Sequence, residues 1–277
     1  MQFLFRLFPL ILAAGAAEQL LLAQARAPQR GAAIPRMADG KPNLNGLWQA
    51  MTSANWDLED HAAEAGPVIA LGAVGAVPAG FGVVEGGKIP YKPEALAKRK
   101  ENYINRVKLD PEVKCYLPGV PRATYMPYPF QIVQSQKDML ISYAYDSAVR
   151  TIHMVKHADA DLDTWMGTSN GHWEGDTLVI DVIGFNGRAW LDRAGNFATD
   201  SLHVIERYSM LDANTISYEA TMEDPAVYTK PWKINVLLYR HREPHARLLN
   251  FECVQFVEEL MYGNLSKKPD QSSEQRP

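Results

Sequence analysis

Several motifs that mark common classes of enzyme are missing from this sequence of 277 residues. It has no complete phosphate-binding G-x-x-x-x-G-K-[ST] loop, no dinucleotide-binding G-x-G-x-x-G and no C-x-x-C pair. These absences disfavour nucleotide, flavin and haem-c chemistry. We therefore expect a protein that works without a cofactor.

Excess positive charge is also missing, since the formal net charge is −4. Proteins that bind nucleic acid or anionic membranes usually carry a basic surface. The composition therefore argues against both partners and favours a small-molecule ligand or substrate. It leaves the oligomeric state open.

Long hydrophobic runs are confined to the start of the chain. One basic residue, Arg6, precedes an apolar run at 7–17, and A-x-A cleavage sites follow at 14–16 and 23–25. This pattern predicts a secretory signal peptide over residues 1–25. The run is too short and broken for a membrane span, and no later stretch could cross a bilayer. We expect export to the periplasm or the extracellular space, with no membrane span in the mature protein.

Cysteine is scarce, with only Cys115 and Cys253 present. An even number of cysteines in an exported protein is consistent with a disulfide. Two small buried thiols are the alternative. The sequence leaves this choice open.

Short alternating segments dominate the region after the leader. They lie at 46–48, 130–135, 139–145, 148–154, 177–183, 201–223, 232–241 and 247–256. Turn-sized polar breaks separate many of them, which predicts about nine or ten antiparallel strands. The expected fold is all-β, an up-and-down antiparallel barrel of the calycin type, with a two-sheet sandwich as the runner-up.

The remaining segments complete the expected domain layout. Residues 26–45 should be an extended leader, 46–262 one barrel domain and 263–277 a disordered tail. Helices are expected at 55–65, capped by Asn55, and at 93–107, where Leu96, Tyr103, Ile104 and Val107 share one face. The Gly-, Ala- and Pro-rich segment 67–90 should form a flexible flap.

The segment 201–223 gives the clearest local prediction. Its two alternating halves meet at residues 212–214, and a three-residue loop with a left-handed Asn214 would place the apolar sets on one face. Glu206 is then a lone carboxylate on the apolar face, and it requires a raised pKa or a buried partner. The predicted cross-strand pairs are Tyr208 with Tyr218, Met210 with Ile216, Arg207 with Glu219 and His203 with Glu223.

Several of these residues are candidates for chemistry. His203 beside Glu223 could act as an acid–base pair, and Arg207 beside Glu219 could hold an anion. Ordinary ion pairs on a solvated sheet face would look the same. Asp181, within the strand at 177–183, could hydrogen-bond a turn or could join Glu206 as a carboxylate pair inside the barrel. Which sheet face points inward decides between these roles.

The loop at 186–200 is unusually polar and should lie on a barrel rim. Asn186, Trp190 and Asp192 would suit a hydroxylated or aromatic ligand. The alternative is a loop held by its own Asp–Arg pairs.

A metal site is the weaker interpretation of residues 153–163. His153 and His157 have the spacing of ligands on a helix, but they straddle a strand end. The Asp-x-Asp-x-Asp run at 159–163 lacks the glycine and the distal glutamate of a calcium loop. We favour a solvated acidic turn and assign no metal.

Two resemblances support this interpretation. Gly46-Leu47-Trp48 resembles the G-x-W signature of lipocalins, which implies a late arginine, Arg240 or Arg242, stacked on Trp48. The strings CYLPGVPRATYMPYPFQIVQ, GHWEGDTLVIDVIGFN, WLDRAG, LHVIERY and EDPAVYTKPW look like a family of secreted soil-bacterial proteins such as those of Acidobacteria. That resemblance implies export and a shared architecture, and it transfers no catalytic residue.

The resulting hypothesis is an exported, cofactor-free enzyme that performs hydration, elimination or isomerisation on a small lipophilic or aromatic molecule inside the barrel. His203 or Glu206 would be the acid or base, and Arg207 would hold developing negative charge. Alternatives are a periplasmic carrier without catalysis and a carbohydrate-active hydrolase using paired carboxylates. The ligand-positioning and ligand-binding residues would be Asp192, Trp190, Asn186, Tyr208, Tyr218, Glu219 and Asp181.

Overall fold

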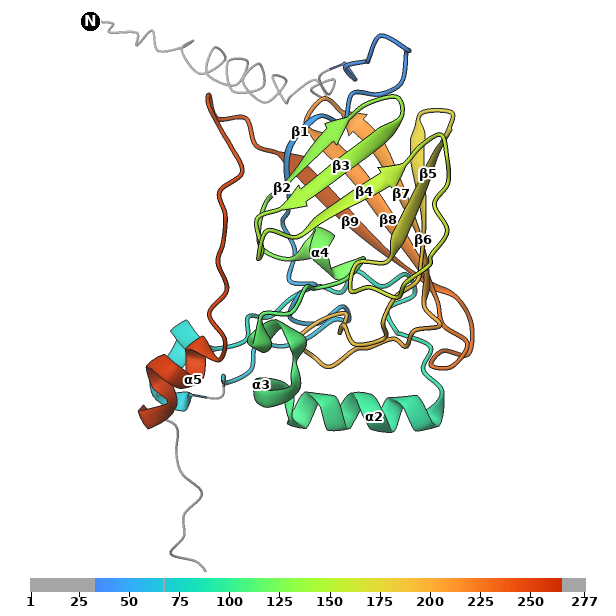
Figure 1. The fold of residues 1–277 in the computed structure, drawn as a ribbon. Coiled ribbons are helices and arrows are strands. Elements are labelled where there is room, and N and C mark those ends of the chain that lie inside the picture. Colours follow the sequence, from blue (N-terminus) through green and yellow to red (C-terminus); the bar gives the residue numbers. More distant parts are fainter. Residues whose placement is uncertain (1–32, 67, 266–277) are drawn as a thin grey trace, which may run out of the picture. The chain divides into compact units, whose positions relative to one another are not determined.

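The computed structural model describes residues 33–66 and 68–265. Nine strands follow one another around a closed barrel, which confirms the expected all-β barrel and not the sandwich (Figure 1). The expected signal peptide and residues 266–277 of the expected tail lie outside the described residues. The strands are β1 (Gly46–Ala50), β2 (Phe130–Gln134), β3 (Asp138–Tyr143), β4 (Val149–His153), β5 (Thr168–Glu174), β6 (Thr177–Ile183), β7 (His203–Asp212), β8 (Thr215–Glu223) and β9 (Trp232–Arg240).

The barrel departs from a pure up-and-down order at one place. Every neighbouring pair is antiparallel except β4 and β5, which run parallel over two residue pairs. Parallel neighbours need a crossing connection rather than a tight turn. The polar segment 154–167, which includes the aspartate run, supplies it.

The β7–β8 hairpin has the predicted register. Tyr208 lies opposite Tyr218, and the other three predicted pairs also form. The turn differs, because Asp212 pairs with Thr215 and a bulge follows Met210. The expected left-handed Asn214 is therefore wrong, since its φ is not positive. Instead the Asp212 carboxylate accepts the Asn214 backbone N–H at 2.7 Å and stabilises a tighter turn.

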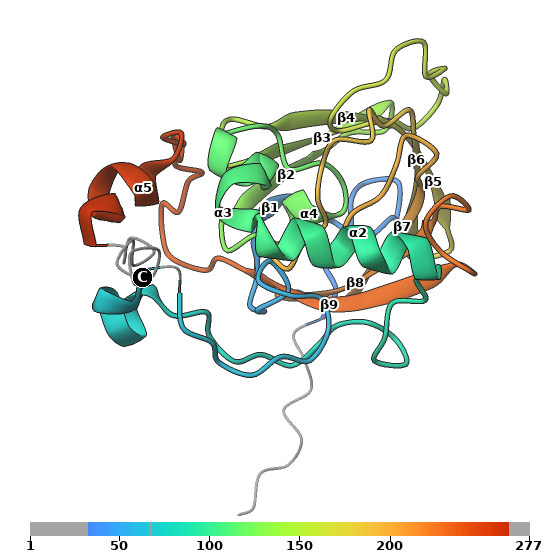
Figure 2. The same cartoon turned by 90° about the horizontal axis from the view of Figure 1, so that it is seen from below.

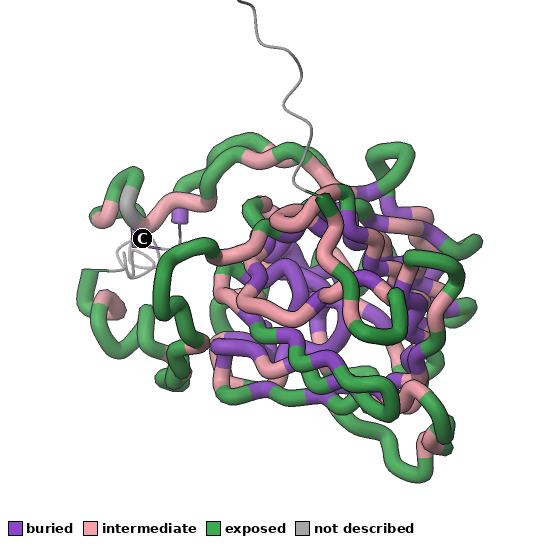
Figure 3. The backbone as a smooth tube through the Cα atoms, turned by 90° about the horizontal axis from the view of Figure 1, so that it is seen from above, coloured by how far each residue is buried: buried purple, intermediate pink, exposed green. Residues whose placement is uncertain are grey.

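The apolar side chains of the strands point inward and are buried. Figure 3 shows the buried positions concentrated in the barrel. Trp48 is fully buried, and the Arg240 guanidinium lies 4.1 Å from its ring centroid. The expected stacking arginine is therefore Arg240, not Arg242. A Cβ on Gly46 would collide with the Arg240 guanidinium, which explains the glycine two residues before Trp48.

Helices and loops cover one end of the barrel (Figures 1 and 2). The expected helix at 93–107 forms as two pieces, but its expected buried face is wrong because Leu96 and Ile104 are 40% and 74% exposed. Asn102 is buried instead and donates to the Gly195 carbonyl at 3.2 Å. The helices are η1 (Ile69–Gly75), α2 (Pro93–Ile104), α3 (Arg106–Leu109), η2 (Pro111–Lys114), α4 (Arg122–Tyr125), α5 (Val257–Tyr262) and η3 (Gly263–Leu265).

The expected helix at 55–65 does not form. Its residues pair instead with the flap, through antiparallel bridges between His61 and Gly80 and between Glu64 and Val77. Asn55, expected as the helix cap, is buried and accepts a hydrogen bond from Arg122. Tertiary partners outweigh the weak helix propensity of this segment.

The two ends of the described chain pack differently from expectation. Leu44, in the expected leader, is fully buried and its N–H donates to the Gln134 side chain at 2.8 Å. The expected strand at 247–256 is an irregular arm that meets the barrel rim at a bridge between Tyr145 and Phe251. Among the described residues, no helix has the length and apolar character that crossing a bilayer requires.

Candidate functional site

Glu206 lies at the centre of a polar cluster inside the barrel. Arg150 binds it through two hydrogen bonds of 2.6 and 3.0 Å. Tyr208 and Tyr218 donate their hydroxyls to the same carboxylate at 3.1 and 2.8 Å. The predicted buried partner of Glu206 is therefore present. Its identity could have been inferred from Arg150, which occupies an inward position between Ala148 and Ile152.

This barrel-interior cluster is sealed from solvent. Glu206 and both tyrosines are fully buried, and Arg150 is 4% exposed. Burial, followed by the charge of Glu206, raises the pKa of Tyr208 and Tyr218 well above the ordinary value. The Arg–carboxylate pair satisfies its charges internally. These residues hold the barrel wall together and do not border the cavity described below.

The polar face of the β7–β8 hairpin points outward. His203 lies between Asp181 at 2.8 Å and Glu223 at 3.4 Å, and all three side chains are 31–46% exposed. Asp181 therefore does not join Glu206, and the expected carboxylate pair is not formed. The strand alternation places the two carboxylates on opposite sides of the barrel wall.

Arg207 and Glu219 also belong to the outer face. Arg207 binds Glu174 at 2.7 Å, while Glu219 binds Lys233 at 2.9 Å. Arg207 and Glu219 are paired in register across β7 and β8, but each forms its ion pair with a different residue. The predicted cross-strand groups thus form ordinary surface ion pairs rather than an enclosed site.

A cavity of about 530 Å³ lies outside the barrel, beside its helix-covered end. We call it the barrel-end cavity. The lining residues come from 56–64 and 68–77, from the α2–η2 region, from the rim loop at 193–194 and from the C-terminal arm, together with Tyr128 and Tyr145. Its aromatic lining residues are Trp56, Tyr103, Tyr128, Tyr145, Phe251 and Phe256.

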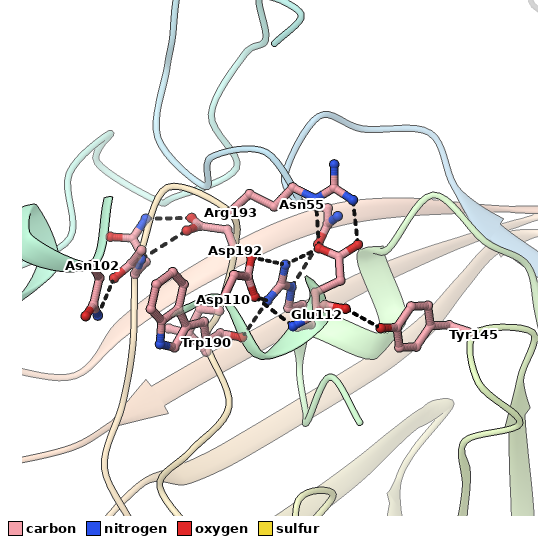
Figure 4. A network of polar contacts seen from close by, with 12 residues as sticks. Asn55, Asn102, Asp110, Glu112, Tyr145, Trp190, Asp192 and Arg193 are labelled. Carbon is pink, nitrogen blue, oxygen red and sulfur yellow. Dashed lines mark hydrogen bonds and ion pairs between the residues drawn. The ribbon is translucent and has the colours of Figure 1, made fainter. Parts of the chain in front are cut away.

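A buried ion network borders this cavity, since Asp110, Glu112 and Arg193 are among the lining residues. Figure 4 shows the polar contacts of this network. Arg122, from α4, binds Asp110 at 3.0 Å and Glu112 at 2.5 Å. Arg193 reaches the same Glu112 carboxylate with two hydrogen bonds of 2.7 Å. Burial opposes ionisation of Glu112, but the two arginines outweigh it and hold its pKa at about 2. Glu112 therefore carries a negative charge that both arginines compensate.

Two further carboxylates, Asp57 and Asp192, share the side-chain amide of Asn196. Asp192 accepts hydrogen bonds from the Leu58 N–H at 2.9 Å and the Asn196 amide at 2.5 Å. The same Asn196 amide lies 3.4 Å from Asp57, which lines the cavity. Burial, and then the charge of Asp57, raises the pKa of Asp192 to about 7. Burial also raises the pKa of Asp57, while Arg99 at 3.2 Å partly offsets that effect.

Guanidinium groups lie over two of the aromatic rings that line the cavity. Arg193 lies 4.3 Å above the Trp56 ring, and Arg106 lies 4.1 Å above the Tyr103 ring. The Tyr103 hydroxyl donates to Glu64. Flat rings beside guanidinium groups favour aromatic ligands or ligands with an extended apolar body.

The C-terminal arm closes one side of the cavity. Phe251 stacks on Tyr128 with ring centroids 4.4 Å apart. Cys253 forms a disulfide with Cys115, which settles the question that the sequence left open. The Phe256 N–H donates to the Val113 carbonyl at 2.8 Å. A covalent bond and a few backbone contacts therefore hold this wall in place.

None of the ten site residues predicted from the sequence lines the barrel-end cavity. Asn186 accepts its own loop's Arg188 N–H, and Trp190 is buried within the rim loop. Asp192 comes nearest, through its hydrogen-bonded neighbour Asn196. The loop at 186–200 is tied down, but by Asn and backbone groups more than by internal Asp–Arg pairs.

Sequence reasoning missed the residues that do line the cavity. None of Trp56, Asp57 and His61 was predicted as a site residue, and their segment was expected to form a helix. The signal available was an aromatic residue, a carboxylate and an imidazole within six positions of a segment that has no clear strand period. Arg193 lies in the polar loop at 186–200, for which the sequence suggested only ion pairs between arginines and aspartates of the loop itself.

Two local patterns do not form sites. His153 pairs with Asp138 at 3.3 Å, and the described residues hold no group of three or more His, Cys, Asp or Glu that could bind a metal ion. Residues 167–171 read G-x-S-x-G, but Ser169 is 2% exposed within β5 rather than on an exposed strand-to-helix turn. It therefore lacks the geometry of a hydrolase nucleophile.

No protein-family model matches the chain, and a search of curated proteins produced no match. The function of this protein therefore has to be inferred from the geometry of the barrel-end cavity.

Proposed function

We propose that this protein binds a small, largely apolar or aromatic molecule in the barrel-end cavity. The observation that carries the proposal is a cavity of about 530 Å³ with aromatic walls and a charged base. Ligand sites commonly have a volume of roughly 300–1,000 Å³ and combine an apolar lining with a few placed polar groups. This cavity has both properties.

The charges at its base are satisfied without a ligand. Glu112 is bound by Arg122 and Arg193, and Asp57 is bound by Arg99. A strongly charged ligand would have to displace one of these pairs, which costs free energy. A neutral or weakly polar ligand would leave them intact while its body packs against the rings of Trp56 and Tyr103.

We also propose that the protein is exported. The pattern of residues 1–25 supports export, because a basic residue, an apolar run and small-residue cleavage sites occur in that order. The Cys115–Cys253 disulfide adds support, since such bonds persist in oxidising compartments. Expression in a secreting host, followed by N-terminal sequencing of the mature protein, tests this part directly.

A cavity-filling variant tests ligand binding. Ala62 lines the cavity and is exposed, so Ala62→Trp should occupy ligand space without disturbing the barrel core. Ala63→Trp is the matched control, because Ala63 is exposed next to it and is not a lining residue. Titration calorimetry with 2-naphthol, indole and dodecanol should show binding to the parent protein. Ala62→Trp should weaken binding by about tenfold or more, and Ala63→Trp should leave it unchanged.

A second candidate is proton-transfer catalysis at the same cavity without a cofactor. The observation that favours it is the raised pKa of Asp57, next to Asp192 with a pKa of about 7. A carboxyl group with a raised pKa is a stronger base than an ordinary aspartate and is a candidate for proton transfer. Screening for hydration or isomerisation of bound ligands tests it: Asp57→Asn should abolish turnover while the ligand still binds. Equal turnover by parent and variant would remove Asp57 from any mechanism.

A further inference from the structure

Asp192 is a fully buried carboxyl group whose hydrogen-bond donors in the described part of the chain are all neutral. The Leu58 N–H donates to it at 2.9 Å, and Asn196 donates its backbone N–H at 3.1 Å and its side-chain amide at 2.5 Å. The two arginines of the neighbouring network form their ion pairs with other carboxylates. The three donors offset part of the cost of ionisation, but a buried carboxylate without a paired cation still favours its protonated form.

Asp57 connects Asp192 to the barrel-end cavity. The Asn196 amide that donates to Asp192 also lies 3.4 Å from the Asp57 carboxylate. Asp57 lines the cavity, and its side chain is 16% exposed. Its ion-pair partner is Arg99, at 3.2 Å. One guanidinium therefore serves two carboxyl groups, which leaves the Asp57–Asp192 pair with excess negative charge unless it holds a proton.

The other charged and titratable groups around the pair do not remove that excess. Those that face it are Glu59, His61, Lys88, Tyr91, Arg122, Tyr125 and Tyr228. Lys88 pairs with Glu59 at 2.7 Å, and Arg122 belongs to a network of two arginines and two carboxylates. Burial raises the pKa of the three tyrosines, so their hydroxyls remain neutral. An imidazole that loses water releases a proton rather than binding one, so any contribution from His61 has the opposite sign.

A ligand in the cavity changes the hydration of this pair. The apolar body of the ligand replaces water next to Asp57, and loss of water disfavours the ionised form of a carboxyl group. Burial within the protein already acts in this direction, because it raises the pKa of Asp57 and, together with the charge of Asp57, raises the pKa of Asp192 to about 7. Filling the cavity therefore favours proton uptake by the pair near neutral pH.

We propose that binding of an apolar ligand in the barrel-end cavity is coupled to uptake of a proton by the Asp57–Asp192 pair, so that the protein retains its ligand at acidic pH and releases it as the solution becomes alkaline. This inference rests on the proposed function and describes how the same site is regulated. The ligand-bound pair holds its proton to a higher pH than the ligand-free pair, so affinity is highest below about pH 7 and falls above it. One proton limits the fall to about tenfold per pH unit.

Titration calorimetry measures the proton directly. Indole is the probe, because it is apolar and does not titrate in this pH range. Its binding to the full-length, disulfide-intact protein is measured at about pH 7 in phosphate and in Tris, two buffers with different ionisation enthalpies. The difference between the two observed enthalpies gives the number of protons bound with the ligand. We expect uptake of a fraction of one proton, and an affinity that falls between about pH 6 and pH 9.

Four variants locate the proton. Asp57→Asn and Asp192→Asn each remove one member of the pair and should reduce the uptake to near zero, with a flatter pH profile. Glu258→Gln is the matched control, because Glu258 also lines the cavity but lies in α5, outside the pair, and this variant should retain the uptake. His61→Gln removes the imidazole and should not lower the uptake. Circular dichroism and thermal unfolding verify that each variant is folded.

The outcomes separate this inference from the proposed function. If indole binds with the same enthalpy in both buffers and with one affinity across the pH series, the inference fails while the proposed function stands. Proton release, or uptake that persists in both Asp57→Asn and Asp192→Asn, overturns it in the same way. If the parent protein binds neither indole nor the other two probes, 2-naphthol and dodecanol, both proposals are overturned. Uptake by the parent protein and by Glu258→Gln, with its loss in the two pair variants, is the expected result.

Discussion

Two buried charged clusters lie in different environments in this protein. In the barrel-interior cluster, one carboxylate and one guanidinium neutralise each other and two tyrosine hydroxyls complete the shell. At the barrel end, Arg122, Arg193, Asp110 and Glu112 form a larger network that borders a cavity. Both satisfy their charges by pairing, but only the second has a surface on which a ligand could act.

The difference separates a structural role from a functional one. A lone acidic residue in an apolar strand looks like a catalytic candidate, yet Glu206 is enclosed by the side chains of its own barrel. Asp57 is unremarkable in the sequence, yet it lies between a cavity and a second buried carboxylate. Access therefore distinguishes the two clusters better than residue type does.

Glu206→Gln tests most directly whether the barrel-interior cluster has a structural role that is separate from the barrel-end cavity. It would leave the Arg150 charge buried without compensation, so the free energy of unfolding should fall by about 3–5 kcal/mol, with unchanged binding at the barrel-end cavity. Urea denaturation measures the loss. Glu219→Gln, on the outer face of the same hairpin, is the control and should cost less than about 1 kcal/mol. A similar loss in both variants would contradict the assignment.

Removing the disulfide should lower the stability of the protein and loosen the wall of the barrel-end cavity. The double variant Cys115→Ser/Cys253→Ser frees the arm, whose bond closes a span of 138 residues. We expect the free energy of unfolding to fall by about 2–4 kcal/mol. Ligand should also dissociate faster, because the arm forms one wall. Stopped-flow displacement of 2-naphthol measures that rate, and an unchanged rate would show that the arm does not retain the ligand.

Arg193→Met should combine a moderate stability loss with weaker binding. It removes two charge-assisted hydrogen bonds to Glu112 and the cation over Trp56, so a loss of about 1–3 kcal/mol is expected. Unlike Glu206→Gln, it should also weaken ligand binding, since Arg193 lines the cavity. Thermal unfolding and calorimetry on the same sample test both effects. Full affinity in this variant would show that the ligand does not contact the base of the cavity.

The smallest expected effect is on pH dependence. The ordinary pKa of Asp192 is 3.8 and the folded value is about 7, so the folded protein holds this proton longer than the unfolded chain. Stability from this group is therefore present below about pH 4 and is lost as pH rises through about 7. Asp57→Asn removes the neighbouring charge and should make that loss shallower. Urea denaturation across this range provides the measurement.

Glu112 has the opposite sign and occupies a different window. Its pKa of about 2 lies below the ordinary 4.5, so its stabilisation is present above about pH 4.5 and is lost as pH falls toward 2. The two groups can therefore be separated in one pH series. If Asp57→Asn leaves the slope between about pH 4 and 7 unchanged, Asp57 does not influence Asp192.

The sequence predicted the barrel where periodicity alone decides the answer. In β7 and β8, every second residue except Glu206 is apolar, so the buried face and the cross-strand register follow from the pattern. The resemblance of Gly46-Leu47-Trp48 to the lipocalin signature implied an arginine stacked on Trp48, and the structure identifies it as Arg240 rather than Arg242. The turn at Asp212 was mispredicted because a side chain capped a tighter loop, and alternation does not encode that choice.

The segments outside the strands were less predictable. The apolar stripe of α2 suggested a buried face, but the helix packs on a polar rim loop and therefore buries Asn102. The sequence predicted a helix at 55–65 because Asn55 is a residue type that commonly caps helices. Its long-range partners, the flap and Arg122, determined its conformation instead.

What the sequence determined by itself was the sheet, because alternation is a local property and each strand carries its own inward face. What only the tertiary structure decided was the site. Trp56, Asp57 and His61 line the same cavity as Arg193 and Phe251, which lie more than a hundred positions away in the chain, and no local pattern predicts that arrangement. Whether a buried charge is sealed or accessible depends on which distant segments cover it. For that reason Glu206, a predicted catalytic residue, is enclosed in the barrel, whereas Asp57, which was not predicted as a site residue, lines the cavity.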